Sequence, residues 1–231
     1  MQIIYEDNDI IAVNKPAGVS VHPDRYHPSD TLIQTIAGQF PEIEGVGEDP
    51  LRPGLVHRLD KDTSGVLVIA RNQKSFEHLK KQFQARAVAK EYIALAVGKI
   101  KEKRGTIALP IGRSKNDPTK RVAEGLMRGA VREARTDYEV IEYFKEAYTL
   151  VRVFPKTGRT HQIRVHLKTM NHPIVCDKLY AGKRYVCPFG LARHFLHASA
   201  LELALPSGAK MRFEADIPDD LERVLEGLRN E

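Results

Sequence analysis

The stretch HRLDKDTSGVLVIA, residues 57–70, joins two different patterns. Its last part, VLVIA, is a continuous apolar run with the length of one strand, which predicts a buried strand. The Thr-Ser-Gly segment before it is typical of a turn that leads into a strand. Arg58 and Asp60 are two residues apart, so on an extended segment their side chains project to the same side. The stretch therefore predicts a polar loop held at the start of a buried strand.

Segments with strand patterns outnumber helical ones on both sides of this stretch. Numerous strands that neighbour one another in sequence are typical of an α+β fold, with a large mixed, mainly antiparallel sheet and flanking helices. The expected helices cover residues 31–40, 72–84, 160–170 and 218–228. Asp30 is the expected cap of the first helix and Thr160 that of the third. The expected strands are two within 2–18 around a turn at 6–9, and others at 66–70, 90–98, 106–112, 132–144, 147–155, 195–206 and 209–216.

The composition indicates a soluble, cytoplasmic globular protein. Of the 231 residues, 42% are hydrophobic, enough for one sizeable core. The amino terminus does not resemble a signal peptide, and apolar runs are shorter than the roughly 20 residues of a membrane span. Cys176 and Cys187 form no CxxC pair, so we expect two free thiols in a reducing compartment.

The charge pattern favours a polyanionic partner. The chain has a net charge of +6, but residues 214–231 carry seven acids and two bases. The other residues therefore have a net charge of +11, which suits nucleic acid.

No metal or cofactor is predicted. His161 and His166 are five residues apart and would diverge by about 140° on a helix, so they do not have the spacing of zinc ligands. The sequence contains neither a phosphate-binding glycine loop nor a dinucleotide fingerprint.

Asp60 is the residue that most suggests chemistry. A free Asp has a pKa of about 3.9, so it is already a carboxylate at neutral pH and needs no general base to act as a nucleophile. Burial would raise that pKa, and a nearby arginine would oppose the rise. Arg58 and Arg164 are the candidate cations.

The predicted helix at 160–170 has two faces. Ile163, Leu167 and Met170 fall on one face, and His161, Arg164 and Lys168 fall on the other. The basic face is either a phosphate surface or site wall, or the solvated side of an ordinary amphipathic helix.

Other nucleophiles fit the sequence less well. Ser64 lacks the Gly-x-Ser-x-Gly elbow of serine hydrolases. Asp60 and Asp62 could form the carboxylate pair of a glycosidase, a nucleoside hydrolase or a DNA glycosylase, but their spacing is equally common in turns.

Five ordered motifs resemble those of the RluA-type family of RNA pseudouridine synthases. They are NKPAGVSVHP at 14–23, HRLDKDTSGVLVIA at 57–70, KEYIALAVG at 90–98, GRTHQIRVHL at 158–167 and HPIVCDKLYAG at 172–182. The resemblance covers about residues 3–215. It implies that residues 1–231 are a single pseudouridine synthase catalytic domain, in a member without the amino-terminal accessory RNA-binding domain.

The resemblance also implies roles for residues of these motifs. Asp60 would be the nucleophile, attacking either the ribose anomeric carbon or carbon 6 of uracil. Tyr92 would stack on the flipped uracil and help the proton to leave carbon 5, and Arg164 would pair with Asp60. Arg58 would fill the gap left in the RNA stack. The other residues expected to contact RNA are His57, Lys15, Thr63, Arg159, His161, Lys101 and Lys103.

The implied substrate is structured RNA, with ribosomal RNA favoured and transfer RNA next, because flipping a base is easiest in loops. A monomer without cofactor or metal is expected. The alternative is a non-catalytic RNA-binding or ribosome-assembly factor on the same fold. Further candidate phosphate ligands are Lys99, Arg104, Arg113, Lys115, Lys120, Arg121 and Arg128, which could equally belong to a solvated loop surface.

Overall fold

The structure is a computed structural model that describes residues 1–24 and 27–231. The chain forms two compact units, unit 1 with residues 1–90 and 198–216, and unit 2 with residues 91–197 and 217–231. Each unit buries its own cluster of apolar side chains. The strands β4 (Ala89–Val97) and β11 (Leu196–Ala204) contribute residues to both units.

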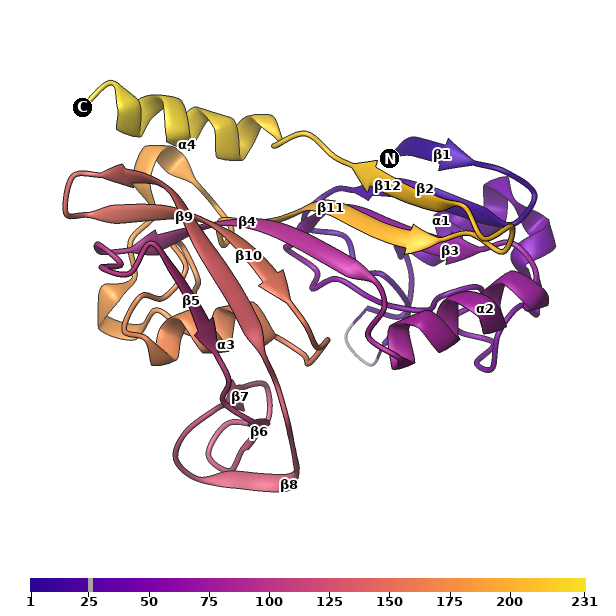
Figure 1. Ribbon diagram of the computed structural model, residues 1–231, viewed down its shortest axis with the longest axis horizontal. Helices are drawn as coiled ribbons and strands as arrows, with labels where there is room; N and C mark the ends of the chain where they lie inside the picture. The colour runs from indigo at the N-terminus through magenta and orange to yellow at the C-terminus, as the bar shows by residue number, and fades with distance from the viewer. Residues whose placement is uncertain (25–26) are drawn as a thin grey trace. The chain divides into compact units, whose positions relative to one another are not determined.

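Unit 1 is built on a meander of three strands. β1 (Gln2–Glu6), β2 (Ile10–Lys15) and β3 (Ser64–Ala70) pair antiparallel, with Val13 opposite both Ile3 and Leu67. All seven residues of β3 are buried, as the apolar run VLVIA predicted. β11 pairs with β12 (Lys210–Glu214) in the predicted hairpin. Figure 1 shows these strands. The loop that contains Asp60 leads into β3, which begins at Ser64.

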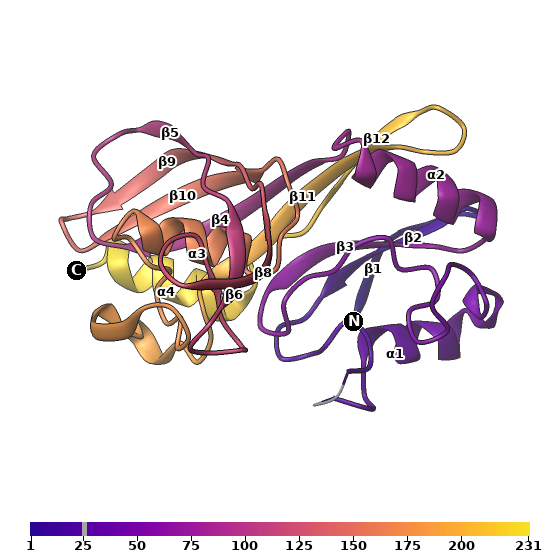
Figure 2. The same ribbon diagram turned by 90° about the horizontal axis from the view of Figure 1, so that it is seen from below.

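Two helices accompany these strands (Figure 2). α1 (Leu32–Gln39) follows Thr31, which is its N-cap, whereas Asp30 has a left-handed φ of 58° and lies one residue outside the cap. The side chain of Gln34 accepts a hydrogen bond from the Thr31 N–H at 3.0 Å. α2 (Gln73–Gln84) begins at Asn72, whose side chain accepts the Ser75 N–H at 2.9 Å. A short 3-10 helix, η1 (Pro41–Ile43), follows α1.

Unit 2 has a second antiparallel series of strands. Its order is β4, β10 (Tyr148–Pro155), β9 (Thr136–Phe144) and β5 (Arg104–Ile107). The helices are α3 (Gln162–Thr169) and α4 (Asp219–Arg229), with the short η2 (Gly182–Arg184) and η3 (Pro188–Gly190) between them. The apolar stripe of α4 is buried in the core of this unit and consists of Leu221, Val224, Leu225 and Leu228.

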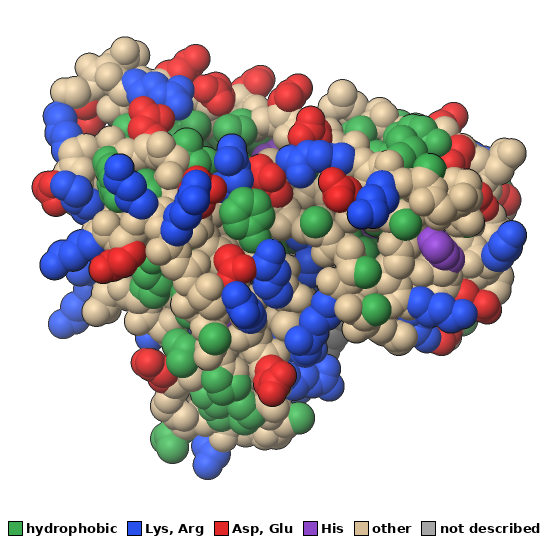
Figure 3. Space-filling model, viewed as in Figure 1, with side chains coloured by type: hydrophobic (Ala, Val, Ile, Leu, Met, Phe, Trp, Pro, Cys, Tyr) green, Lys and Arg blue, Asp and Glu red, His purple; other side chains and the backbone are tan. Residues whose placement is uncertain are grey.

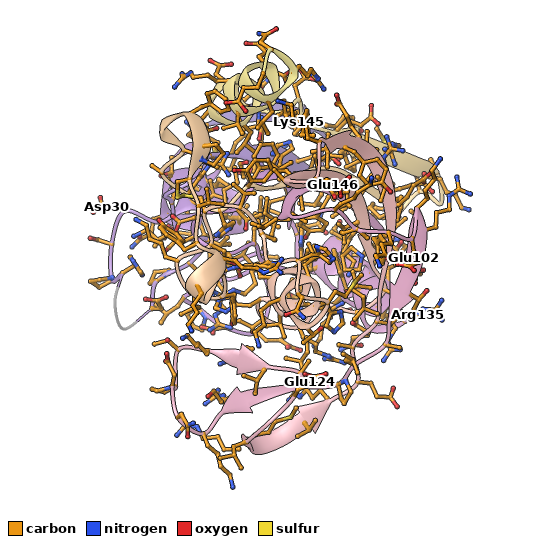
Figure 4. All side chains as sticks on the ribbon, turned by 90° about the vertical axis from the view of Figure 1, so that its left-hand side faces the viewer. Asp30, Glu102, Glu124, Arg135, Lys145 and Glu146 are labelled. Atoms are coloured by element: carbon orange, nitrogen blue, oxygen red, sulfur yellow. A yellow bond between two sulfur atoms is a disulfide. The ribbon has the colours of Figure 1, made fainter. Side chains whose placement is uncertain are left out.

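A small three-stranded sheet was not expected. The segment 106–112, predicted as one strand, divides into β5 and β6 (Ile111–Ser114) on either side of Pro110. β6 pairs with β7 (Arg121–Val122) and β8 (Met127–Arg132). Figure 1 shows this sheet beyond the ends of β5 and β9, and Figure 4 shows its side chains, with Glu124 labelled. Its apolar side rests on Val165 and Tyr180.

The predicted fold class is confirmed. Among the described residues, nine strands form the large sheet, three form the small one, and the strand pairs described above are antiparallel. Within the same residues, no helix has the length and apolarity needed to cross a membrane.

Candidate active site

The Asp60 loop lies between two well-fixed points of unit 1. Leu59 is buried, and the Thr63 N–H donates to the backbone oxygen of Asp60 at 3.1 Å, which closes a turn before β3. Asp60 itself is half-buried. The loop therefore presents a carboxylate from a closed backbone turn, one residue after a side chain anchored in the interior.

Lys15 joins this loop to the NKPAG segment. Its side chain is fully buried, and Nζ donates to the backbone oxygens of Pro16, Val19 and Lys61 at 2.8, 2.9 and 2.8 Å. The Gly18 N–H also donates to the Lys61 oxygen, at 3.0 Å. The three bonds from Nζ use all three N–H groups of the Lys15 ammonium. The surroundings of Lys15 therefore do not support its predicted contact with RNA, because it acts as an internal cross-link between two loops.

Arg58 is exposed and has a partner that the sequence analysis missed. Its Nη1 donates to Nε2 of His22 at 2.9 Å, while Nδ1 of His22 donates to the Pro23 oxygen at 2.8 Å. Burial, with a smaller contribution from the charge of Arg58, lowers the pKa of His22 below its ordinary value. The imidazole is therefore neutral near pH 7, and its Nε2 holds the arginine by accepting a hydrogen bond. The only sequence signal for His22 was its position in the NKPAGVSVHP motif.

His57 and Thr63 face the interior of unit 1. Nε2 of His57 accepts the Val68 N–H at 3.0 Å, and the ring stacks on Phe83 with 4.7 Å between centroids. Burial lowers the pKa of His57 to about 3, so it stays neutral. Thr63 is 2% exposed. These positions fit support of the loop better than the RNA contact that was predicted for both residues.

Unit 2 supplies Tyr92 from β4. Tyr92 is half-buried, lies opposite Val153 of β10 and packs against the apolar core. Lys101 and Lys103 follow β4 and are exposed, as contact with phosphate requires. Arg159 is half-buried and donates from Nε to the Glu133 oxygen at 3.0 Å.

Arg164 lies in the middle of α3 and is only 7% exposed. The helix starts later than predicted, with His161 as N-cap at a left-handed φ of 57°, and every residue from Gln162 to Leu167 is buried. The interpretation of this face as an ordinary solvated one is therefore wrong for Arg164, although Lys168 is exposed. Burial of a guanidinium requires a fixed anionic or polar partner.

Asp177 meets that requirement and was missed by sequence reasoning. Its Oδ2 accepts from Nε of Arg164 at 2.8 Å and its Oδ1 accepts from Nη2 at 2.9 Å, a side-on pair with two parallel bonds. Burial alone would raise the pKa of this carboxyl, but the hydrogen bonds and positive charge of Arg164 outweigh it and hold the pKa below its usual value. Asp177 stands in the HPIVCDKLYAG motif, which was the one signal for it. The predicted pairing of Arg164 with Asp60 stays a prediction.

The expectation of free thiols is wrong. Cys176 and Cys187 form a disulfide that closes a loop of eleven residues. The bond holds the segment that begins with Asp177. Spacing in the sequence did not reveal the pair, because turns in 177–187 return the chain to Cys176.

The described part of the chain contains no cluster of three His, Cys, Asp or Glu residues that could hold a metal ion. Of the residues predicted to be catalytic, unit 1 carries the half-buried carboxylate of Asp60, and unit 2 carries the buried guanidinium of Arg164 and the half-buried ring of Tyr92. A carboxylate can act as a nucleophile without a general base, and an aromatic ring can stack on a flipped nucleobase.

Known proteins are similar to this chain over most of its length. Residues 9–169 match the family described as RNA pseudouridylate synthase. The chain is 45% identical over 218 residues to an uncharacterized RNA pseudouridine synthase of Chloroflexus aurantiacus, covering 94% of this chain and 66% of the relative. It is 36% identical over 240 residues to ribosomal large subunit pseudouridine synthase D of Yersinia pestis, covering 99% and 71%. The chain thus spans about two thirds of the length of such relatives.

A solved structure shows the same fold. Human RNA pseudouridylate synthase domain containing 4 superimposes with a TM-score of 0.77 at 26% identity, covering 99% of this chain and 93% of that one. The family match includes the residues predicted from the motifs at 57–70, 90–98 and 158–167. The resemblance seen in the sequence is confirmed: the chain belongs to the RluA-type RNA pseudouridylate synthase family.

Proposed function

We propose that this protein isomerises uridine to pseudouridine in structured RNA, with ribosomal RNA as its first substrate and transfer RNA as the second candidate. The observation that carries the proposal is the match of nearly the whole chain to a ribosomal large subunit pseudouridine synthase, with Asp60, Tyr92 and Arg164 all present. Membership of the family supports the reaction, and the relative's name supports the class of RNA.

Asp60 is proposed as the nucleophile. Its carboxylate attacks either the ribose anomeric carbon or carbon 6 of uracil, and the bond from ribose to nitrogen 1 breaks. The uracil turns, carbon 5 bonds to the anomeric carbon, and the bond to Asp60 breaks. Carbon 5 then loses its proton to a base, and nitrogen 1, freed from the ribose, takes up a proton. Product and substrate have the same atoms, so the reaction needs no oxidant, reductant or water. The Lys15 cross-link supports this role because it fixes the backbone next to the nucleophile.

Tyr92 and Arg164 complete the proposed catalytic set. Tyr92 offers a half-buried ring on a rigid strand, on which a flipped uracil can stack. Arg164 offers a fixed positive charge that keeps a carboxylate ionised. Arg58 is proposed to enter the space that the flipped base leaves in the RNA, and its exposure and its hydrogen bond to His22 support this role.

Phosphate binding is proposed for the exposed basic residues of unit 2. Lys101 and Lys103 follow β4, and other cations lie on the small sheet and its turns. Figure 3 shows Lys and Arg side chains spread over this face of the protein and interspersed with acids. Such contacts set affinity and register without reading the sequence of the RNA. The exposed candidates on the small sheet are Arg113, Lys115 and Arg128.

The experiment that tests the function is tritium release from RNA labelled at carbon 5 of uridine. Ribosomal and transfer RNA transcripts are offered separately to the wild type and to Asp60→Asn, which keeps the size of the side chain but removes the nucleophile. Release from ribosomal RNA that is lost in the variant supports the proposal. Release of free uracil would indicate a hydrolase. If neither RNA releases tritium although the protein still binds RNA, the non-catalytic RNA-binding factor is favoured.

A further inference from the structure

The buried carboxylate of Asp177 in unit 2 binds both the Arg164 side chain and the backbone of the turn that follows it. The oxygens of Asp177 bind Nε and Nη2 of Arg164, and Oδ1 also accepts the backbone N–H groups of Leu179 and Tyr180 at 3.0 and 3.2 Å. Asp177 is fully buried. The position of the Tyr180 backbone is therefore tied to the same group that holds the arginine.

The ring of Tyr180 covers the guanidinium of Arg164. Tyr180 is 8% exposed, and Cζ of Arg164 lies 5.0 Å from the ring centroid. This distance is within the range of a cation–π interaction. Asp177 thus restrains the arginine through two of its N–H groups, while Tyr180 restrains its face. Two bonds to one carboxylate still allow the guanidinium to tilt, and an aromatic contact on its face opposes that tilt.

The hydroxyl of Tyr180 is itself held from two sides. A hydrogen bond of 2.7 Å joins it to Nδ1 of His161, the N-cap of α3, and it accepts the Arg121 N–H of β7 at 2.9 Å. The ring lies in the apolar cluster that includes Ile111 and Ala123 of the small-sheet region. Tyr180 therefore connects α3, the 177–180 turn and the small sheet at the position of one arginine.

We propose that Tyr180 is a positioning residue that fixes the orientation of Arg164 for catalysis. This inference rests on the proposed function, in which Arg164 acts on the reacting centre. The ring sets the tilt of the guanidinium, and the hydroxyl sets the position of the ring. Removal of the hydroxyl breaks the hydrogen bonds of the ring to His161 and β7. The guanidinium of Arg164 then has a less well defined orientation.

The test measures single-turnover tritium release at saturating enzyme for Tyr180→Phe and Tyr180→Leu. Tyr143→Phe is the matched control, because the Tyr143 hydroxyl also makes an internal bond, 2.9 Å to the Ile100 oxygen in the same unit, without any contact to Arg164 in that bond. We expect a loss on the order of 10-fold in rate for Tyr180→Phe and a larger loss for Tyr180→Leu, with unchanged RNA affinity. Tyr143→Phe should keep the wild-type rate and show a similar change in melting temperature.

A double-mutant cycle separates positioning from simple loss of stability. If Tyr180 acts through Arg164, Tyr180→Phe should cause no further loss of rate in an Arg164→Lys background. The lysine lacks the planar guanidinium whose orientation Tyr180 is proposed to fix. Equal losses in both backgrounds would overturn the inference, and so would a rate for Tyr180→Phe equal to that of Tyr143→Phe. If Tyr180→Leu does not fold, Tyr180→Phe still decides. A wild type without turnover would instead count against the proposed function.

Discussion

Among the described residues, each unit contains a buried lysine or arginine, Lys15 in unit 1 and Arg164 in unit 2, and the two side chains are held in different ways. Lys15 of unit 1 is fully buried with three neutral backbone oxygens around its ammonium, whereas Arg164 of unit 2 is 7% exposed with both oxygens of one carboxylate on its fork. Lysine is a compact charge with three rotatable donors, and arginine is a planar fork that matches a carboxylate. The lysine therefore cross-links loops, while the arginine keeps a defined direction.

The largest effect is expected where a buried ion pair is broken. Arg164→Ala leaves the fully buried Asp177 without its arginine, which should lower the free energy of unfolding by about 3 to 5 kcal/mol. Urea denaturation measures this change. A loss below about 1 kcal/mol would mean that the pair behaves like a surface one.

Lys15→Met tests the other buried cation. It removes the donor from three backbone oxygens, which should cost about 3 kcal/mol and lower turnover by loosening the Asp60 loop. Lys74→Met on the exposed side of α2 is the control and should change stability by less than about 0.5 kcal/mol. If Lys15→Met is as mild as its control, the loops are held by other contacts, and the comparison with Arg164 fails.

The disulfide should stabilise unit 2, where it joins Cys176, the residue before Asp177, to Cys187. Reduction, or Cys187→Ser, opens a loop of eleven residues, and such a loop corresponds to about 3 kcal/mol or less. Thiol titration of the denatured protein, with melting temperatures measured with and without reductant, tests it. Two reactive thiols in protein purified without reductant, together with equal melting temperatures, would contradict the bond.

Acid should lower the stability of unit 1 through His57, which bonds to the Val68 N–H and stacks on Phe83. The pKa of His57 is about 3 in the folded protein against an ordinary value of 6.5, so the folded state binds fewer protons than the unfolded state. Its contribution to stability is complete above pH 6.5 and is lost as the pH falls toward 3, by up to about 1.4 kcal/mol per pH unit. Replacement by Gln should flatten the pH dependence of urea denaturation.

The flattening should be partial, because burial also lowers the pKa values of His22 and His166. These two side chains remain in the His57→Gln protein and lose stability in acid with the same sign. An unchanged pH dependence in the variant would show that His57 is already accessible to protons in the native state.

The smallest effect is expected from exposed cations, which lack the partners of the buried pair. Replacement of Lys101 and Lys103 by Gln should leave stability unchanged and reduce the salt dependence of RNA binding by roughly one unit of slope per lost phosphate contact. Binding measured over a salt series tests this, with Lys74→Gln as the control. An unchanged slope would assign these residues to a solvated loop surface.

Much of the fold could be predicted because local periods determine it. The run VLVIA became β3, the alternating segments became β4, β9 and β10, and the hairpin of β11 and β12 formed around its predicted turn. The small sheet was missed because β7 has only two residues and β8 is almost fully exposed, so neither shows a hydrophobic period. Thr31 and Asp30 were confused because both are good caps by residue type.

The candidate site was predictable as a set of motifs and not as a set of contacts. Asp60, Tyr92 and Arg164 were chosen from motifs, and the family match now supports the class of enzyme. The partners of the polar side chains were not predictable. Lys15 and Arg58 both looked like RNA ligands, yet one is fully buried and the other exposed.

The sequence by itself determined the fold class, the basic character of the chain and the family, because these depend on local period, composition and ordered motifs. Only the tertiary structure decided which groups hold the polar side chains in place. Lys15 reaches a carbonyl 46 residues away, and the Tyr180 hydroxyl meets an N–H 59 residues away. Such partners are set by the way strands and turns pack, since burial forces each charged group to find a partner wherever the fold brings one near.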